Sequence, residues 1–206
     1  MISIAIIDYG MGNLWSVSSA IKYLGYEAVI TSCPDKIKSS DILILPGVGS
    51  YRLAMEALHK KNLIDPLKEA VCIKERKILG ICLGMQLMTD SSTEDGLTEG
   101  LSYFEGSVNR FDHSRVKNLK VPHIGFNLVR SPSDSILFSG LDSSSYYYFV
   151  HSYCLEDQAL NSLCSISNHG YDFVAAFERD NFFGTQFHPE KSQTNGLKLL
   201  QNFIRC

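Results

Sequence analysis

The stretch that most constrains the fold is Ile78–Gln86, an apolar run that ends in a cysteine just before the beginning of a predicted helix. Its first half is typical of a buried parallel strand. Cys82 stands at the junction between Gly80 and Gly84. A sharp strand-to-helix turn lifts its central side chain off the sheet, and small neighbours let a substrate come close.

Two interpretations of Cys82 follow from this position. The positive end of the helix dipole favours a thiolate over a thiol, so the sulfur can be a nucleophile. The alternative is a structural core cysteine, because free cysteines are often simply buried. The choice depends on whether the rest of the chain supplies a base and an anion-binding loop.

Composition excludes several classes of function. The chain has 206 residues, a net charge of -3 and a pI of about 6.1, so nucleic acid and anionic membranes are not expected partners. We find no apolar segment of the roughly 20 residues that cross a bilayer, and the N-terminus resembles a strand rather than a signal peptide. The six cysteines have no metal-ligand spacing. We therefore expect a cytoplasmic protein with no metal and no cofactor.

The first half of the chain alternates short apolar runs with helical patterns. The predicted strands are Ile2–Ile7, Tyr26–Thr31, Ile42–Leu45 and Ile78–Cys82, and the predicted helices are Asn13–Leu24, Tyr51–His59 and Ile64–Glu75. We expect Asn13 to cap the first helix. This order predicts an α/β fold with a central, mostly parallel sheet flanked by helices, whose active site lies at the carboxyl ends of the strands.

The pattern changes after Ser91. A polar loop over residues 92–96 is followed by short, aromatic and partly alternating runs, which predict antiparallel additions to the sheet. These runs are Tyr103–Phe111, Val121–Val129, Tyr146–Leu155, Leu163–Asn168, Phe173–Phe177 and Phe182–Phe187. Asn195–Ile204 is predicted to close the chain as a helix. Because no linker or repeat interrupts it, we expect a single domain over residues 1–206.

A base for Cys82 is available at His188. It lies at the end of a predicted strand, and Pro189 stiffens the turn that follows. Residues two apart in an extended segment point the same way, so Glu190 can reach the His188 ring and stabilise its charged form. The alternatives are a solvated turn or a metal site, but the cysteine and histidine spacings lack a recognisable ligand set.

A candidate oxyanion-binding loop is Gly47-Val48-Gly49, which follows a predicted strand at the same sheet edge as Cys82. Acyl transfer through a thiolate builds negative charge on the carbonyl oxygen, which backbone amides can stabilise. Two glycines let the loop turn an amide inward, and the amide of Leu83 is a second candidate donor.

The combination of motifs resembles a known family. Gly80–Gln86, Pro46–Gly49 and Gln186–Ser192 together resemble class I glutamine amidotransferases, which use a Cys-His-Glu triad. Asp8–Asn13, Val121–Asn127 and Tyr148–Tyr153 narrow the resemblance to glutaminase subunits of imidazole glycerol phosphate synthase. It extends from Ile4 to Phe203.

The resemblance implies a flavodoxin-like fold and hydrolysis of L-glutamine through a thioester on Cys82. Ammonia would pass to a (β/α)₈-barrel synthase subunit in a heterodimer serving histidine biosynthesis. The implied roles are substrate binding at Gly49, Gln86, Glu94, Ser152 and Tyr153, and partner contact at Asn13, Phe126, Tyr148 and Lys191. His151 beside them can be structural or functional.

One position departs from the family pattern. Phe126 stands where the family usually has Trp, which keeps the apolar bulk but loses the indole N–H donor. A paralogous subunit that supplies ammonia for amidation of a surface sugar (lipopolysaccharide or nonulosonic acid) is therefore an alternative. Two others are a stand-alone hydrolase of γ-glutamyl peptides and a catalytically silent regulatory subunit.

Overall fold

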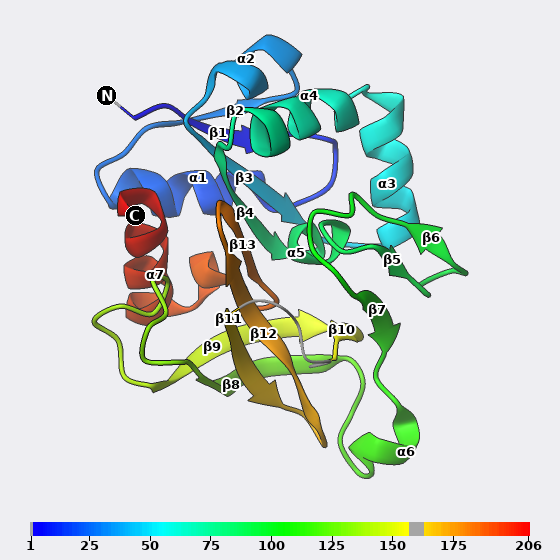
Figure 1. The fold of residues 1–206 in the computed structure, drawn as a ribbon. Coiled ribbons are helices and arrows are strands. Elements are labelled where there is room, and N and C mark those ends of the chain that lie inside the picture. Colours follow the sequence, from blue (N-terminus) through cyan, green and yellow to red (C-terminus); the bar gives the residue numbers. More distant parts are fainter. Residues whose placement is uncertain (1, 157–162) are drawn as a thin grey trace.

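The computed structural model describes residues 2–156 and 163–206 (Figure 1). The strands are β1 Ile4–Ile7, β2 Ala28–Thr31, β3 Ile42–Gly47, β4 Lys77–Cys82, β5 Ser91–Ser92, β6 Thr98–Glu99, β7 Ser107–Arg110, β8 His123–Arg130, β9 Ser144–His151, β10 Tyr153–Leu155, β11 Leu163–Asn168, β12 Asp172–Arg179 and β13 Phe182–Thr185. The α-helices are α1 Leu14–Tyr23, α2 Pro34–Ser39, α3 Tyr51–Lys60, α4 Ile64–Lys68, α5 Leu83–Leu87, α6 His113–Val116 and α7 Gln193–Arg205. A π-helical turn covers Glu69–Ile73 and a 3-10 turn covers Pro189–Lys191.

The main sheet has the strand order β2-β1-β3-β4-β13-β12-β11-β8-β9. The pairs from β2 to β13 are parallel, and the pairs from β13 to β9 are antiparallel. The fold class predicted from the sequence, a mostly parallel sheet with antiparallel additions in the C-terminal half, is therefore confirmed.

The parallel half of the sheet is covered on both faces, which explains why its strands are apolar throughout. Ile4 and Ile6 of β1 belong to the core shared with α1 and α7. Ala5 and Ile7, which alternate with them, belong to the core shared with α2, α3 and α4. Figure 1 shows these two helical layers on opposite sides of β1, β3 and β4. Burial on both faces leaves the ends of the strands for function.

A smaller sheet with the order β10-β7-β5-β6 lies beside the carboxyl ends of the parallel strands. After β9 the chain passes through Ser152 into β10, which pairs with β7 of the smaller sheet. In the same sheet β5 pairs with β6 and β7. This arrangement brings Glu94, in the β5–β6 turn, and Tyr153, at the start of β10, to the same edge as Cys82.

Several local predictions differ from the structure. Residues 34–39, where no helix was predicted, form α2, and the strand predicted over 103–111 is formed only over 107–110. Asn13 precedes α1, but within the described residues its side chain makes no capping hydrogen bond. Only its carbonyl oxygen engages the helix, accepting from Val17 N at 3.3 Å. The predicted cap was therefore wrong in its chemistry although the helix begins where expected.

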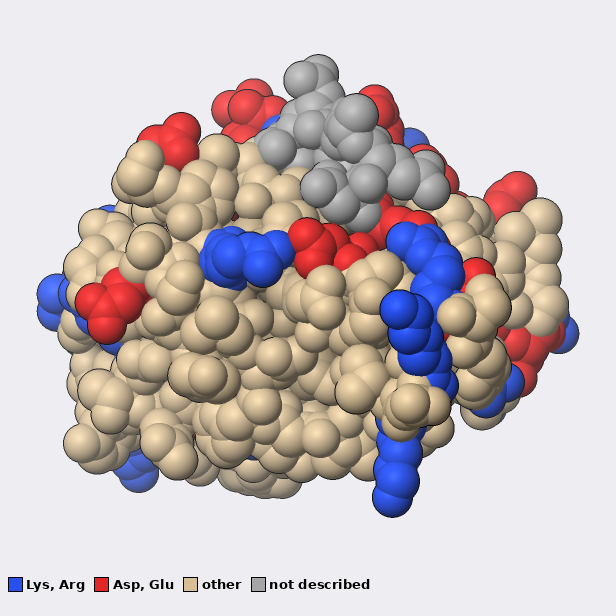
Figure 2. Space-filling model, turned by 90° about the horizontal axis from the view of Figure 1, so that it is seen from below, with Lys and Arg blue, Asp and Glu red and all other residues tan. Residues whose placement is uncertain are grey.

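The surface in Figure 2 consists mostly of uncharged side chains, with acidic and basic ones next to each other along one band. A face that mixes both signs does not attract a polyanion. Among the described helices, none is both long and apolar enough to span a bilayer.

Candidate active site

Cys82 occupies a strained position at the join of β4 and α5. Its φ of 53° and ψ of -109° lie outside the regions that side-chain-bearing residues favour. The flanking glycines leave no room for side chains. A Cβ on Gly84 would lie 1.6 Å from the Leu45 carbonyl oxygen, and one on Gly80 would lie 2.6 Å from Met85 Cα. The tight approach of α5 to the sheet therefore requires both glycines and holds Cys82 at the turn.

His188 and Glu190 form a buried pair directly after the central strand β13. His188 Nδ1 lies 2.8 Å from Glu190 Oε1, and their side chains are 2% and 1% exposed. Glu190 accepts from Nδ1–H, which leaves Nε2 as the working nitrogen of the ring. Among the described residues Nε2 has no conventional hydrogen-bond partner. Glu190 thus orients the ring through Nδ1, and Nε2 is available to Cys82.

The electrostatics favour a charged His188. Burial alone lowers the pKa of an imidazole, but the interactions with Cys82 and Glu190 outweigh burial and raise the pKa of His188 to about 9. The cysteine and the histidine therefore adjoin in space although 106 positions (188 minus 82) separate them in the sequence. This arrangement can hold a thiolate beside an imidazolium and move a proton between them.

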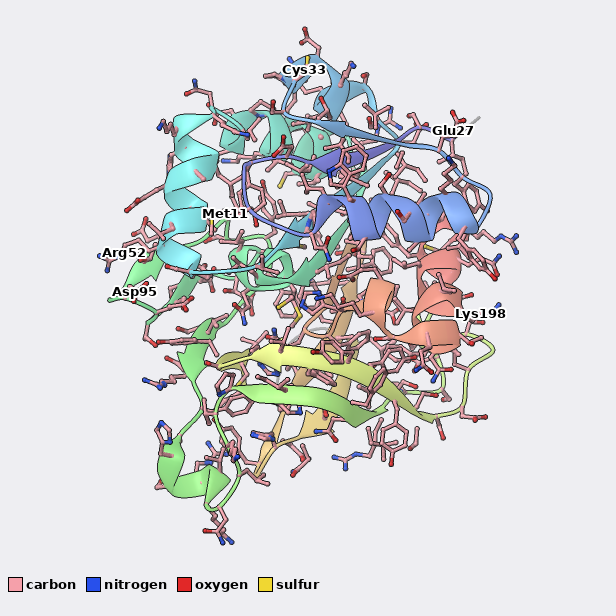
Figure 3. All side chains as sticks on the ribbon, turned by 180° about the vertical axis from the view of Figure 1, so that it is seen from behind. Met11, Glu27, Cys33, Arg52, Asp95 and Lys198 are labelled. Atoms are coloured by element: carbon pink, nitrogen blue, oxygen red, sulfur yellow. The ribbon has the colours of Figure 1, made fainter. Side chains whose placement is uncertain are left out.

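The loop after β3 lies next to the cysteine, as predicted. Gly47 pairs with Cys82 in the sheet register, and Gly49 has a φ of +107°, which suits only glycine. A Cβ on Gly49 would lie 2.8 Å from the Met11 methyl group. Met11 follows β1 and points toward this region in Figure 3. Leu83 begins α5, and helix geometry leaves its amide without an intrahelical partner.

A pocket of about 410 Å³ opens in front of the sulfur, within the size range of small-ligand sites. Every residue predicted to bind glutamine lines it, and so do three of the four candidate oxyanion residues, Val48, Gly49 and Leu83. Its lining comprises Val48, Gly49, Cys82, Leu83, Gln86, Glu94, Pro122, Val150, His151, Ser152 and Tyr153. Gly47 is not among them.

Glu94 is held in the pocket wall by α3. The Tyr51 amide at the beginning of α3 donates to Glu94 Oε2 at 2.8 Å, and Ser50 Oγ donates to Asp95 at 2.8 Å. Figure 3 shows Asp95 beside Arg52 at this helix end. Burial is the main reason that the pKa of Glu94 is raised. A cationic group bound nearby would favour the carboxylate.

Comparison with known proteins identifies the family. Residues 5–206 match the family described as Glutamine amidotransferase class-I. The chain belongs to the class I glutamine amidotransferase family. The resemblance predicted from the sequence motifs is thereby confirmed.

Curated relatives of this chain include subunits of imidazole glycerol phosphate synthase. The chain is 48% identical over 204 residues to imidazole glycerol phosphate synthase subunit HisH of Sulfurimonas denitrificans, which covers 98% of this chain and 97% of the relative. It is 44% identical over 204 residues to subunit HisH 1 of Campylobacter jejuni, with 98% and 99% covered.

Solved structures show the same amidotransferase fold at low sequence identity. PurLQS from Thermotoga maritima has a TM-score of 0.75 at 15% identity, covering 99% of this chain and 98% of the matched chain. The CTPS glutaminase domain of Trypanosoma brucei with bound acivicin has a TM-score of 0.67 at 16% identity, covering 100% and 94%. At these identities the likeness concerns the fold.

The residues predicted to face a partner gather around one part of the amidotransferase surface. Phe126 is 49% exposed, and its ring packs edge-on against Tyr148 with centroids 5.6 Å apart. Lys191 Nζ lies 5.8 Å from the Tyr148 ring centroid. Asn13 stands at the beginning of α1, which contacts the 3-10 turn that carries Lys191. The structure thus brings Phe126, Tyr148 and Lys191 together beside His188 and Glu190, and Asn13 precedes a helix that contacts the same turn.

Gln186 is a site residue that our sequence reasoning did not single out. It is fully buried, and its Nε2 lies 3.8 Å from the Cys82 sulfur. The only local signal is its position two residues before His188. His151 also has a defined environment, because its Nε2 lies 3.0 Å from His123 Nδ1. The β8–β9 register pairs these two histidines directly.

Proposed function

We propose that this chain is the glutaminase subunit of an imidazole glycerol phosphate synthase. It hydrolyses L-glutamine to glutamate and passes the ammonia to a synthase subunit of the (β/α)₈-barrel type, in histidine biosynthesis. The observation that carries the proposal is the buried His188–Glu190 pair, whose free Nε2 adjoins a strained cysteine in a pocket. The names of the relatives support the pathway.

The first half of the reaction forms a thioester. His188 Nε2 takes the proton of the Cys82 thiol, and Glu190 stabilises the imidazolium that results. The thiolate attacks the side-chain amide carbon of glutamine. The tetrahedral intermediate collapses as His188 returns the proton to the departing nitrogen, so ammonia leaves and the γ-glutamyl group stays on sulfur.

The second half releases glutamate. A water molecule gives one proton to His188 Nε2 and attacks the thioester carbon. The carbon–sulfur bond breaks, and the proton returns to the Cys82 sulfur. In both halves the charge on the carbonyl oxygen would be met by backbone amides of the Gly47–Gly49 loop and Leu83, each worth roughly 3 kcal/mol.

The glutamine head group would bind in the part of the pocket lined by Glu94 and Gln86. Glu94 has one oxygen committed to the Tyr51 amide, and we assign its other oxygen to the substrate ammonium. Both donors of the Gln86 Nε2 group are engaged, on the Tyr153 carbonyl and on Gln186 Oε1, each at 2.9 Å. The side-chain carbonyl oxygen of Gln86 therefore remains to accept a hydrogen bond from the glutamine head group. The Ser152 and Tyr153 backbone and Gly49 complete the site.

The patch formed by Asn13, Phe126, Tyr148 and Lys191 is the proposed docking surface for the synthase subunit. An exposed ring (Phe126) and a half-buried ring (Tyr148) beside a cation are typical of the central part of an interface. Because the patch lies close to the 3-10 turn after His188, a partner docked there would receive ammonia without its release to water.

The test is glutamate production by the purified chain with and without a synthase subunit encoded in the same genome. The proposal predicts weak hydrolysis by the chain alone, strong activation by the synthase subunit, and loss of both in Cys82→Ser. Full activity of Cys82→Ser would refute it. Activation by a sugar-amidating partner instead would select the paralogous role, and release of glutamate from γ-glutamyl peptides would select a stand-alone hydrolase.

A further inference from the structure

Gln186 has no part in the mechanism above, yet it touches the reacting sulfur. It follows β13, and its amide N donates to the Ala175 carbonyl at 2.8 Å, which keeps the backbone extended. Its side chain is fully buried, with Nε2 3.8 Å from Cys82 Sγ. That distance suits an N–H donor and a sulfur acceptor.

The orientation of the Gln186 amide is determined by a backbone carbonyl on the other side of the pocket. The Tyr153 oxygen can only accept, so the Gln86 side chain must present its NH₂ group there, at 2.9 Å. The same Gln86 Nε2 also donates to the Gln186 side chain at 2.9 Å, so the accepting atom there must be the Gln186 oxygen, Oε1. The NH₂ group of Gln186 is consequently directed at the sulfur.

A second chain of donors holds the Tyr153 carbonyl in place. His151 Nδ1 donates to it at 2.8 Å, so His151 Nε2 must accept, and it does so from His123 Nδ1 at 3.0 Å. His123 Nε2 in turn accepts from Asn127 Nδ2 at 3.1 Å. Every ring nitrogen of the pair is satisfied in the neutral form. Burial, as the largest cause, lowers the pKa of His151 to about 3 and that of His123 to about 4.

We propose that Gln186 is a further catalytic residue, whose amide N–H stabilises the Cys82 thiolate, and that Gln86, His151 and His123 are positioning residues that aim this donor. The role rests on the proposed glutaminase chemistry. No bond to Gln186 forms or breaks, and the proton leaving the sulfur still goes to His188 Nε2. The donor strengthens as charge develops on sulfur and weakens when the thioester forms.

The Gln186 N–H offsets an unfavourable contact of the Cys82 thiolate. The Val150 carbonyl oxygen lies 4.0 Å from Cys82 Sγ, where it can accept from a thiol but repels a thiolate. The N–H of Gln186, 3.8 Å from the same sulfur, offsets that repulsion. Without Gln186, the charged His188 alone would offset it while the sulfur is a thiolate.

The experiment is the rate of alkylation of Cys82 by iodoacetamide as a function of pH, which requires neither glutamine nor a partner. The tryptic peptide Ile78–Arg110 contains Cys82 and none of the other five cysteines, so mass spectrometry of that peptide reports this sulfur alone. Gln186→Met keeps the bulk and removes the donor. Gln186→Glu keeps the acceptor for Gln86 but places an oxygen against the sulfur.

At neutral pH we expect Gln186→Met to slow alkylation about tenfold, with the midpoint of the pH profile moved upward, and Gln186→Glu to slow it further. Thr185→Val is the matched control: Thr185 is the last residue of β13, next to Gln186 and equally buried, and its hydroxyl donates to the Phe187 carbonyl at 3.1 Å instead. It should alkylate like the wild type.

An unchanged profile in a folded Gln186→Met variant would overturn the proposal, even if the chain hydrolyses glutamine. If that variant fails to fold, Gln86→Met provides the second measurement, because it frees the Gln186 amide to turn away. It should slow alkylation severalfold with the fold retained, and wild-type rates there would equally refute the role. If the wild-type chain produces no glutamate, but Gln186→Met and Gln186→Glu are still alkylated more slowly than the wild type, the proposed function is refuted and the role of Gln186 is not.

Discussion

Replacing Glu190 by Gln tests how much of the catalytic power of His188 depends on its carboxylate. The pair is buried and joined at 2.8 Å, so solvent does not screen it. Raising the pKa of His188 from 6.5 to about 9 corresponds to roughly 3 kcal/mol of preference for the imidazolium. Cys82 and Glu190 share that effect. Loss of Glu190 should therefore cost about 1.5 kcal/mol, or at least tenfold in kcat.

The assay is glutamate formation by the chain in complex with its synthase subunit, for the wild type and Glu190→Gln. We expect kcat to fall and KM to stay within about twofold, because Glu190 does not line the pocket. NMR titration of His188 in Glu190→Gln should give a pKa below the wild-type value. An unchanged kcat together with an unchanged pKa of His188 would refute the reasoning.

The same pair makes a signed prediction about stability. The pKa of His188 is higher in the folded chain, about 9, than the 6.5 expected in the unfolded chain. Protonation of His188 therefore stabilises the folded form fully below about pH 6.5, and this stabilisation is lost as the pH rises through about 9. The difference in unfolding free energy between wild type and Glu190→Gln should therefore be larger at pH 6 than at pH 9, measured by urea denaturation. A difference that grows with pH would contradict the assigned direction.

Further predictions concern the turn, the loop, the docking patch and the domain. Cys82→Ser should abolish glutamine hydrolysis while its circular dichroism spectrum stays like the wild type. Gly47→Ala should cost about 1–3 kcal/mol of stability by thermal unfolding, because its Cβ would lie 2.3 Å from Tyr9 Oη, and Tyr9→Phe should restore part of the loss. Phe126→Ala should weaken the affinity for the synthase subunit, measured by calorimetry, about tenfold, and an unchanged Kd would remove Phe126 from the interface. One cooperative calorimetric transition would support a single domain over residues 1–206, and two separate transitions would refute it.

The parallel half of the fold could be predicted because burial on both faces makes its strands apolar throughout. β1, β3 and β4 were found in this way, and the motifs identified Cys82, His188 and Glu190. In the smaller sheet, β7 and β10 lie within predicted strands, but β5 and β6 were missed because they have two residues each, too few for any periodicity.

The polar network behind the cysteine was missed for a different reason. Gln86 and Gln186 are 100 positions apart, so their contact depends on how β4 and β13 pair in the sheet and leaves no local pattern. His123 and His151 meet through the register of β8 with β9, which a sequence does not specify. Asn13 suited a cap by residue type, but its backbone at φ -90° and ψ 65° is not that of a capping residue.

The most direct test of the catalytic pair is covalent capture of Cys82 by a glutamine-like chloroketone, followed by mass mapping of the chain in complex with its synthase subunit. We predict one adduct, on the peptide Ile78–Arg110, formed slowly in His188→Ala and not at all in Cys82→Ser. An adduct elsewhere, or one that forms equally fast without His188, would contradict the claim that the buried histidine and the strained cysteine act as one catalytic pair.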